Sequence, residues 1–135
     1  TVTRDCLVSG LDLYGARQDC RLRVCEAGPF IVLKLLAFAA RMQPKDAFDL
    51  HQMALHYDGG PAAVIAGFAA EREANSGFAA ARTTLAEHFA SRDANGPLRG
   101  AAFVAGENRT RDALDDELRF REELVNFAQT LLERT

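Results

Sequence analysis

The spacing of hydrophobic residues changes near residue 27, and the change predicts two kinds of structure. Before that point, apolar and polar side chains alternate over residues 1–8 and again over residues 20–25, whose sequence is CRLRVC. A period of two is typical of strands with one buried face. Gly10 and Gly15 frame the residues between, so this segment is either a hairpin or a strand interrupted by a turn. We therefore expect two or three half-buried strands within residues 1–27.

From residue 28 onward the spacing favours helices separated by glycine and proline. Apolar side chains fill residues 30–40, FIVLKLLAFAA, almost without a gap, which is typical of a helix packed on most of its circumference. A second helix is expected from Lys45 to about His56, with Pro44 at its start. Further helices are expected after Pro61, from Phe78, and from about Asp112 to the end of the chain.

One stretch between these helices is ambiguous. Asn95-Gly96-Pro97 reads as a helix stop, and the following residues 98–109, LRGAAFVAGENR, have a short apolar core that suits a strand or one helical turn equally well. The sequence therefore predicts an α+β chain, mostly helical, with the strands in residues 1–27 and about five helices in residues 28–135. Because two strands do not make a stable sheet alone, their expected partner is a sheet from an upstream segment or from another chain.

Composition and charge exclude several classes of protein. The chain has 135 residues, 48% of them hydrophobic, which suits one domain. Its net charge of −3 is spread along the chain, so charge gives no support for a nucleic-acid acceptor. No apolar run reaches the roughly 20 residues of a membrane helix, and no signal peptide is recognisable at the start. The three cysteines lack a CxxC pair and favour reduced thiols, which predicts a cytoplasmic protein.

The charged residues of the first two expected helices form the most informative pattern. Lys34 lies in an otherwise apolar helix, and because burying an unpaired ammonium is costly, it must reach solvent or an anion. Arg41 lies two turns later on the same face. On the next helix Asp46 and Asp49 share a face, and Lys45 precedes the first of them. If the two helices form a hairpin, these residues meet in a cluster, and such clusters are more often structural than catalytic.

The same residues resemble a known family. The pattern K-L-x-A-x-x-x-R at residues 34–41, followed by K-D-x-x-D-L at residues 45–50, is similar to the C-terminal half of nucleotidyltransferase-like proteins related to the AbiEii abortive-infection toxins. The resemblance covers roughly residues 20–58. It implies transfer of a nucleotide monophosphate from a nucleoside triphosphate (NTP) to an acceptor, with Mg²⁺ and the triphosphate held by a Gly-Ser turn and a strand-borne D-x-D.

The resemblance also implies a role for each charged residue. Lys34 would face the phosphates, and Arg41 and Lys45 would order the helices or contact substrate. Asp46 and Asp49 would be the catalytic residues, either positioning the lysine or helping to activate the acceptor. Phosphoryl chemistry depends mainly on positioning and charge neutralisation, so this set of residues is chemically suitable.

The metal-binding half of the family pattern is absent from this sequence. It contains no D-x-D, and Ser9-Gly10 stands in the reverse order. Together with the start at Thr1, this predicts the C-terminal part of a longer parent, inactive alone, with residues 1–27 as part of a truncated sheet. Mg²⁺ and NTP are implied for the parent, and neither is expected bound to this chain. Expected partners are a nucleotide, an antitoxin-like protein, or a second copy paired through the strand edge.

Two alternatives remain beside this interpretation. The first is a non-catalytic helical domain that acts as an interaction module or scaffold. The second, a metal site at His51 and His56, is disfavoured because five positions separate the two histidines by about 140° on a helix, unlike the i, i+4 pair of a zinc helix. We therefore predict no metal ligands in this chain.

Overall fold

The computed structural model describes residues 3–107 and 110–135, and it confirms a mostly helical α+β fold. Over these residues a two-stranded antiparallel sheet precedes six helices, and none of these helices is long and apolar enough to cross a membrane. The strands are β1 (Thr3–Leu11) and β2 (Arg17–Cys25), and the helices are α1 (Ala27–Arg41), α2 (Pro44–His56), α3 (Gly60–Ala74), α4 (Phe78–His88), α5 (Asn95–Ala105) and α6 (Arg111–Arg134).

The two strands form a hairpin, which settles the choice that the glycines left open. Their register runs from Thr3 opposite Cys25 to Leu11 opposite Arg17. The carboxylate of Asp12 closes the turn by accepting hydrogen bonds of 2.9 Å from the backbone N–H groups of Tyr14 and Ala16. Such side-chain bonds to the backbone are the usual way in which aspartate stabilises a turn. The first two residues of the expected first strand lie outside the described residues.

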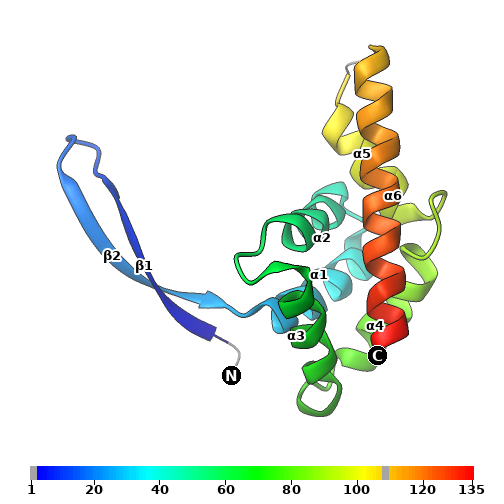
Figure 1. Ribbon diagram of the computed structural model, residues 1–135, viewed down its shortest axis with the longest axis horizontal. Coiled ribbons are helices and arrows are strands. Elements are labelled where there is room, and N and C mark those ends of the chain that lie inside the picture. Colours follow the sequence, from blue (N-terminus) through cyan, green and yellow to red (C-terminus); the bar gives the residue numbers. More distant parts are fainter. Residues whose placement is uncertain (1–2, 108–109) are drawn as a thin grey trace.

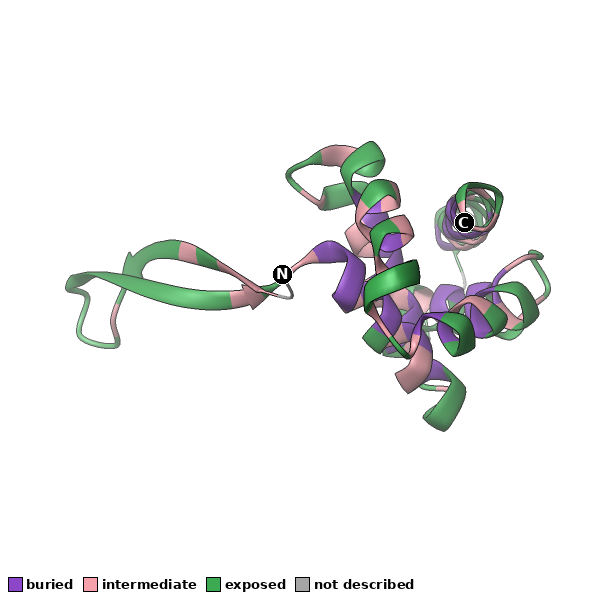
Figure 2. Ribbon diagram, turned by 90° about the horizontal axis from the view of Figure 1, so that it is seen from below, coloured by how far each residue is buried: buried purple, intermediate pink, exposed green. Residues whose placement is uncertain are grey.

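The expectation that the strands are half-buried is wrong. The hairpin projects from the helical body, and most of its residues are exposed (Figures 1 and 2). Leu7 and Leu11 are 68% and 73% exposed. Alternation determines which side chains share a face, but burial also requires a second layer. Beyond the contacts of Arg4 at its foot, no described segment of this chain packs across the hairpin.

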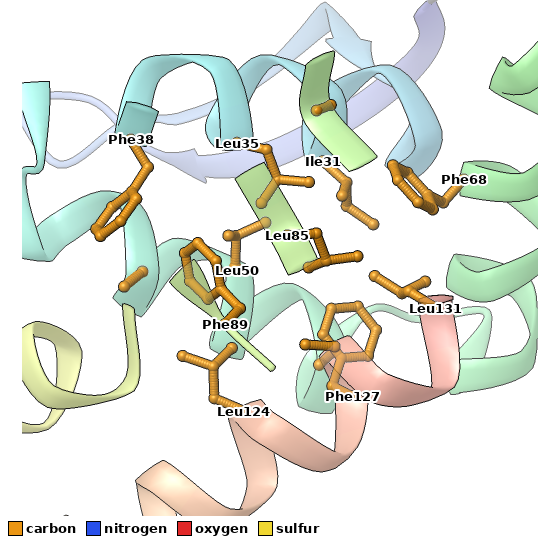
Figure 3. Packing of buried hydrophobic residues seen from close by; sticks show 14 of the residues in the cluster. Ile31, Leu35, Phe38, Leu50, Phe68, Leu85, Phe89, Leu124, Phe127 and Leu131 are labelled. Carbon is orange, nitrogen blue, oxygen red and sulfur yellow. The ribbon is translucent and has the colours of Figure 1, made fainter. Parts of the chain in front are cut away.

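The hydrophobic core lies among the helices, with α1 at its centre. Helix α1 packs against α2, α3 and α4, and α6 lies across the other side of the core (Figure 1). Figure 3 shows the buried side chains of α1 turned toward those of α2, α4 and α6. The rings of Phe38 and Phe89 meet edge to face, with centroids 4.9 Å apart. The gapless apolar run of residues 30–40 is therefore a helix with neighbours on several sides, as its pattern predicts.

Helix α5 corrects the interpretation of the ambiguous stretch. Asn95-Gly96-Pro97 does not stop a helix but forms the first turn of one that continues to Ala105. Proline is tolerated in a first turn because its missing N–H would have no partner there, so the same residues suit a stop and a start. In the fold, Gly96 lies so close to the ring of Phe89 that a side chain would overlap it, so this first turn packs tightly against the residue that follows α4.

Candidate functional site

A tight connection between α1 and α2 brings the predicted site residues together. Helix α1 ends at Arg41, and Met42 adopts the left-handed conformation with φ of 50°. Gln43 is extended, and Pro44 begins α2 with its fixed backbone angle. These two linking residues turn the chain back on itself, so the charged side of α2 faces the charged side of α1.

All five predicted residues meet in one network, which we call the α1–α2 charge cluster. The Nζ atom of Lys34 lies 3.3 Å from Oδ1 of Asp46 and 2.6 Å from Oδ2 of Asp49. Arg41 donates two hydrogen bonds to Asp46, of 2.9 and 2.8 Å. The Nζ atom of Lys45 lies 3.0 and 2.9 Å from the two oxygens of Asp49. Lys34 therefore meets anions, as the cost of burying an unpaired ammonium requires.

The cluster holds its groups in their charged forms. Hydrogen bonds from Arg41, and secondarily from Lys34, outweigh burial and lower the pKa of Asp46 below its ordinary value. Burial alone would raise the pKa of Asp49, but bonds from Lys34 and Lys45 leave it lowered. The hydrogen bond to Asp49 is the main cause of a raised pKa for Lys34. With three cations and two carboxylates, the cluster carries one excess positive charge.

This electrostatic environment limits the chemistry of the two carboxylates. A general base works best with a pKa near the operating pH, whereas the pKa values of Asp46 and Asp49 are shifted away from neutrality. Their oxygens are engaged by Lys34, Arg41 and Lys45, so the cluster does not offer Mg²⁺ a set of free oxygen ligands. The arrangement suits carboxylates that orient cations rather than carboxylates that take protons or bind metal.

A pocket of about 430 Å³ adjoins the cluster, and we call it the hairpin-foot pocket. It lies where the foot of β1 meets α1, α2 and the residues just after α2. Asp49 belongs both to the pocket wall and to the cluster, and Phe30, another wall residue, has its ring centroid 5.6 Å from Nζ of Lys34. The lining residues are Arg4, Phe30, Asp49, Gln52, Met53, His56, Tyr57 and Asp58.

Sequence reasoning missed most of this pocket. Arg4 closes one side by pairing with Asp58 at 3.3 Å and by lying over the ring of Tyr57, 5.4 Å from its centroid. Arg4 and Asp58 are 54 positions apart in the chain, so no local pattern connects them. The turn sequence Asp58-Gly59-Gly60-Pro61 predicts that the chain changes direction after α2, but it does not show which residues pack there.

The histidines lie in separate surroundings. His51 is buried between α2 and α6, and its Nε2 lies 2.9 Å from Oε2 of Glu123. His56 lines the hairpin-foot pocket, and His88 lies 4.0 Å from its neighbour Glu87. In the described ranges 3–107 and 110–135, no three histidine, cysteine or acidic side chains are placed together so that they could hold a metal ion.

Comparisons with known proteins add no family to this description. No family model, curated protein or solved structure matches the chain.

Proposed function

We propose that this chain is the C-terminal part of a cytoplasmic nucleotidyltransferase-like protein of the AbiEii type, in which Lys34 binds the phosphates of an NTP. The observation that carries the proposal is the position of Lys34. Its ammonium is held by Asp46 and Asp49 at the border of an open pocket, and its side chain keeps 22% of its surface exposed. Lys34 does not itself line the pocket, but its partner Asp49, at 2.6 Å, does.

Each residue of the cluster then has a defined task. Asp46 and Asp49 keep Lys34 protonated and fix the direction of its ammonium, which saves the cost of ordering a long side chain when phosphate arrives. Arg41 and Lys45 are 57% and 66% exposed and add positive charge at the rim. The excess cation of the cluster favours an anion over a neutral ligand. The ligands for Mg²⁺ would belong to another part of the parent protein.

The test is nucleotide transfer by the parent protein carrying Lys34→Ala. Loss of one preorganised charge in the transition state typically lowers turnover by about 100-fold or more, and we expect a loss of that size. Transfer of label from α-³²P-labelled NTP to macromolecules of a cell extract is the readout, with Arg72→Ala, an exposed cation on α3, as the matched control. Circular dichroism checks that the variants fold.

Two results would contradict the assigned roles. Normal transfer by the Lys34→Ala variant would exclude the phosphate role, and unfolding of that variant would favour a structural ion-pair cluster. Asp49→Asn separates the roles further. A positioning residue should change turnover more than melting temperature, whereas a structural residue should do the reverse.

A second candidate function rests on the hairpin. Cys6, Val8, Cys20 and Leu22 share one face of it, and both Val8 and Leu22 are nearly half exposed. An uncovered two-stranded sheet with free edges is a template for pairing with another sheet. A non-catalytic module that docks through this hairpin, on an antitoxin-like protein or a second copy, is the alternative. The gene decides between them, because a reading frame with G-S and D-x-D upstream of Thr1 favours the enzyme.

A further inference from the structure

We propose that the hairpin-foot pocket binds the nucleobase of the NTP whose phosphates lie against Lys34. This inference rests on the proposed function and assigns a place to the part of the substrate that the charge cluster does not hold. The pocket has the size of a small-molecule site, since such sites span about 300–1,000 Å³ and this one measures about 430 Å³.

The pocket lining suits a flat, uncharged ring. Phe30 from α1 and Tyr57 after α2 provide two aromatic side chains, and Met53 adds a flexible apolar surface. Bases of any sequence stack on aromatic side chains because every base has a π-face, and each such contact contributes appreciably to affinity. The lining therefore predicts stacking of a base rather than capture of a charged group.

The charges around the pocket also match the two ends of a nucleotide, an uncharged base and anionic phosphates. The two lining carboxylates already have cationic partners: Asp58 pairs with Arg4 at 3.3 Å, and Asp49 pairs with Lys34 at 2.6 Å. The pocket thus presents little free charge, whereas the cluster beside it carries one excess cation. A nucleotide has this same distribution, with a neutral base at one end and anionic phosphates at the other. Asp49 and Phe30 lie between the pocket and the cluster, so the base and the phosphates would meet beside these two residues.

Contacts between side chains hold two walls of the pocket in place. Arg4 donates a hydrogen bond of 3.3 Å to Asp58 and lies over the ring of Tyr57. Gln52, with its amide bonded to the ring of His51 at 3.3 Å, is held in a fixed place on the other wall.

The experiment is saturation-transfer difference NMR on this chain with ATP, GTP, CTP and UTP at millimolar concentration, each compared with its nucleoside. Millimolar ligand reveals contacts too weak to persist at lower concentration. Phe30→Leu and Tyr57→Leu remove one aromatic ring each, and Phe103→Leu makes the same change at an exposed ring on α5. Lys34→Ala reports on the phosphate end. Thermal melting checks that each variant folds.

The expected result separates the two ends of the ligand. Saturation should reach the base protons, the dissociation constant should rise about fivefold or more in Phe30→Leu and Tyr57→Leu, and Phe103→Leu should bind as the wild type does. Lys34→Ala should weaken the triphosphates and leave the nucleosides unchanged.

Each contrary outcome is decisive. Unchanged binding by both pocket variants, together with weaker triphosphate binding by Lys34→Ala, would overturn the base pocket and leave the proposed function standing. An effect of the pocket variants with none from Lys34→Ala would keep the base pocket and remove the phosphate role. Base protons that receive no saturation from any of the four NTPs or their nucleosides would overturn the base pocket.

Discussion

Arg41 donates two hydrogen bonds to the buried carboxylate of Asp46, of 2.9 Å from Nε to Oδ2 and 2.8 Å from Nη2 to Oδ1. This paired geometry is the strongest form of the arginine–carboxylate contact. It connects the last residue of α1 to the first turn of α2, with Asp46 only 1% exposed and Arg41 more than half exposed. The contact therefore stabilises the helix hairpin on which the whole candidate site is built, whatever the site binds.

Asp46→Ala should lower the free energy of unfolding by about 2–4 kcal/mol, because it removes the shared acceptor of Lys34 and Arg41 and leaves a gap in a buried position. This loss of unfolding free energy should be smaller than for a fully buried ion pair, because the guanidinium of Arg41 can return to water. Urea unfolding followed by circular dichroism is the measurement, with Asp115→Ala, an exposed carboxylate on α6, as the control. A loss no larger than that of the control would show that the cluster contributes little to stability.

The stability of the fold should depend on pH through His51. Burial lowers the pKa of His51 below its ordinary value, against the opposing effect of Glu123. Below pH about 6.5 the folded chain therefore binds fewer protons at His51 than the unfolded chain does. The contribution of His51 to the free energy of unfolding is complete above that pH and is lost as the pH falls from there through the folded pKa. His51→Gln should flatten the decline in unfolding free energy between pH 7.5 and 5.5, by less than about 1.4 kcal/mol per pH unit. An unchanged slope would contradict this account.

Gly28→Ala should destabilise the fold strongly, because a methyl group on Gly28 in α1 would overlap the carbonyl oxygen of Gly67 in α3. Both are backbone atoms, so the helices would have to separate, and overpacking of this kind costs about 1–3 kcal/mol or more. Gly10→Ala, on the hairpin, meets nothing within 4 Å and serves as the control. Thermal unfolding of the two variants gives the comparison, and equal melting temperatures would show that α1 and α3 do not approach so closely.

Backbone amides of the hairpin should exchange with solvent at least about 100-fold faster than those of α1, because a hairpin with both faces exposed opens at little cost. Hydrogen exchange followed by mass spectrometry, on peptides covering residues 3–25 and 30–40, measures the ratio. Comparable protection would mean that the hairpin is covered in solution. Repeating the exchange at tenfold lower protein concentration then shows whether a second copy covers it.

Most of the helical body and the membership of the charge cluster follow from the sequence alone. Both depend on local geometry: in a helix, spacing alone fixes which side chains share a face, so Lys34 and Arg41 on one helix and Asp46 and Asp49 on the next were placed correctly. The connection between the helices is short enough that an antiparallel pair is the natural result. The same local logic predicted alternating strands, and the hairpin has them.

What those elements pack against depends on the tertiary structure. Alternation in β1 and β2 could not show that both faces stay exposed, because burial depends on a second layer that spacing does not describe. Asn95-Gly96-Pro97 suits a helix stop and a helix start equally, and only the fold shows that it begins α5. The hairpin-foot pocket needs Arg4 beside Tyr57 and Asp58, residues more than fifty positions away. Local periodicity is fixed by bond geometry, whereas a pocket is fixed by how whole elements pack.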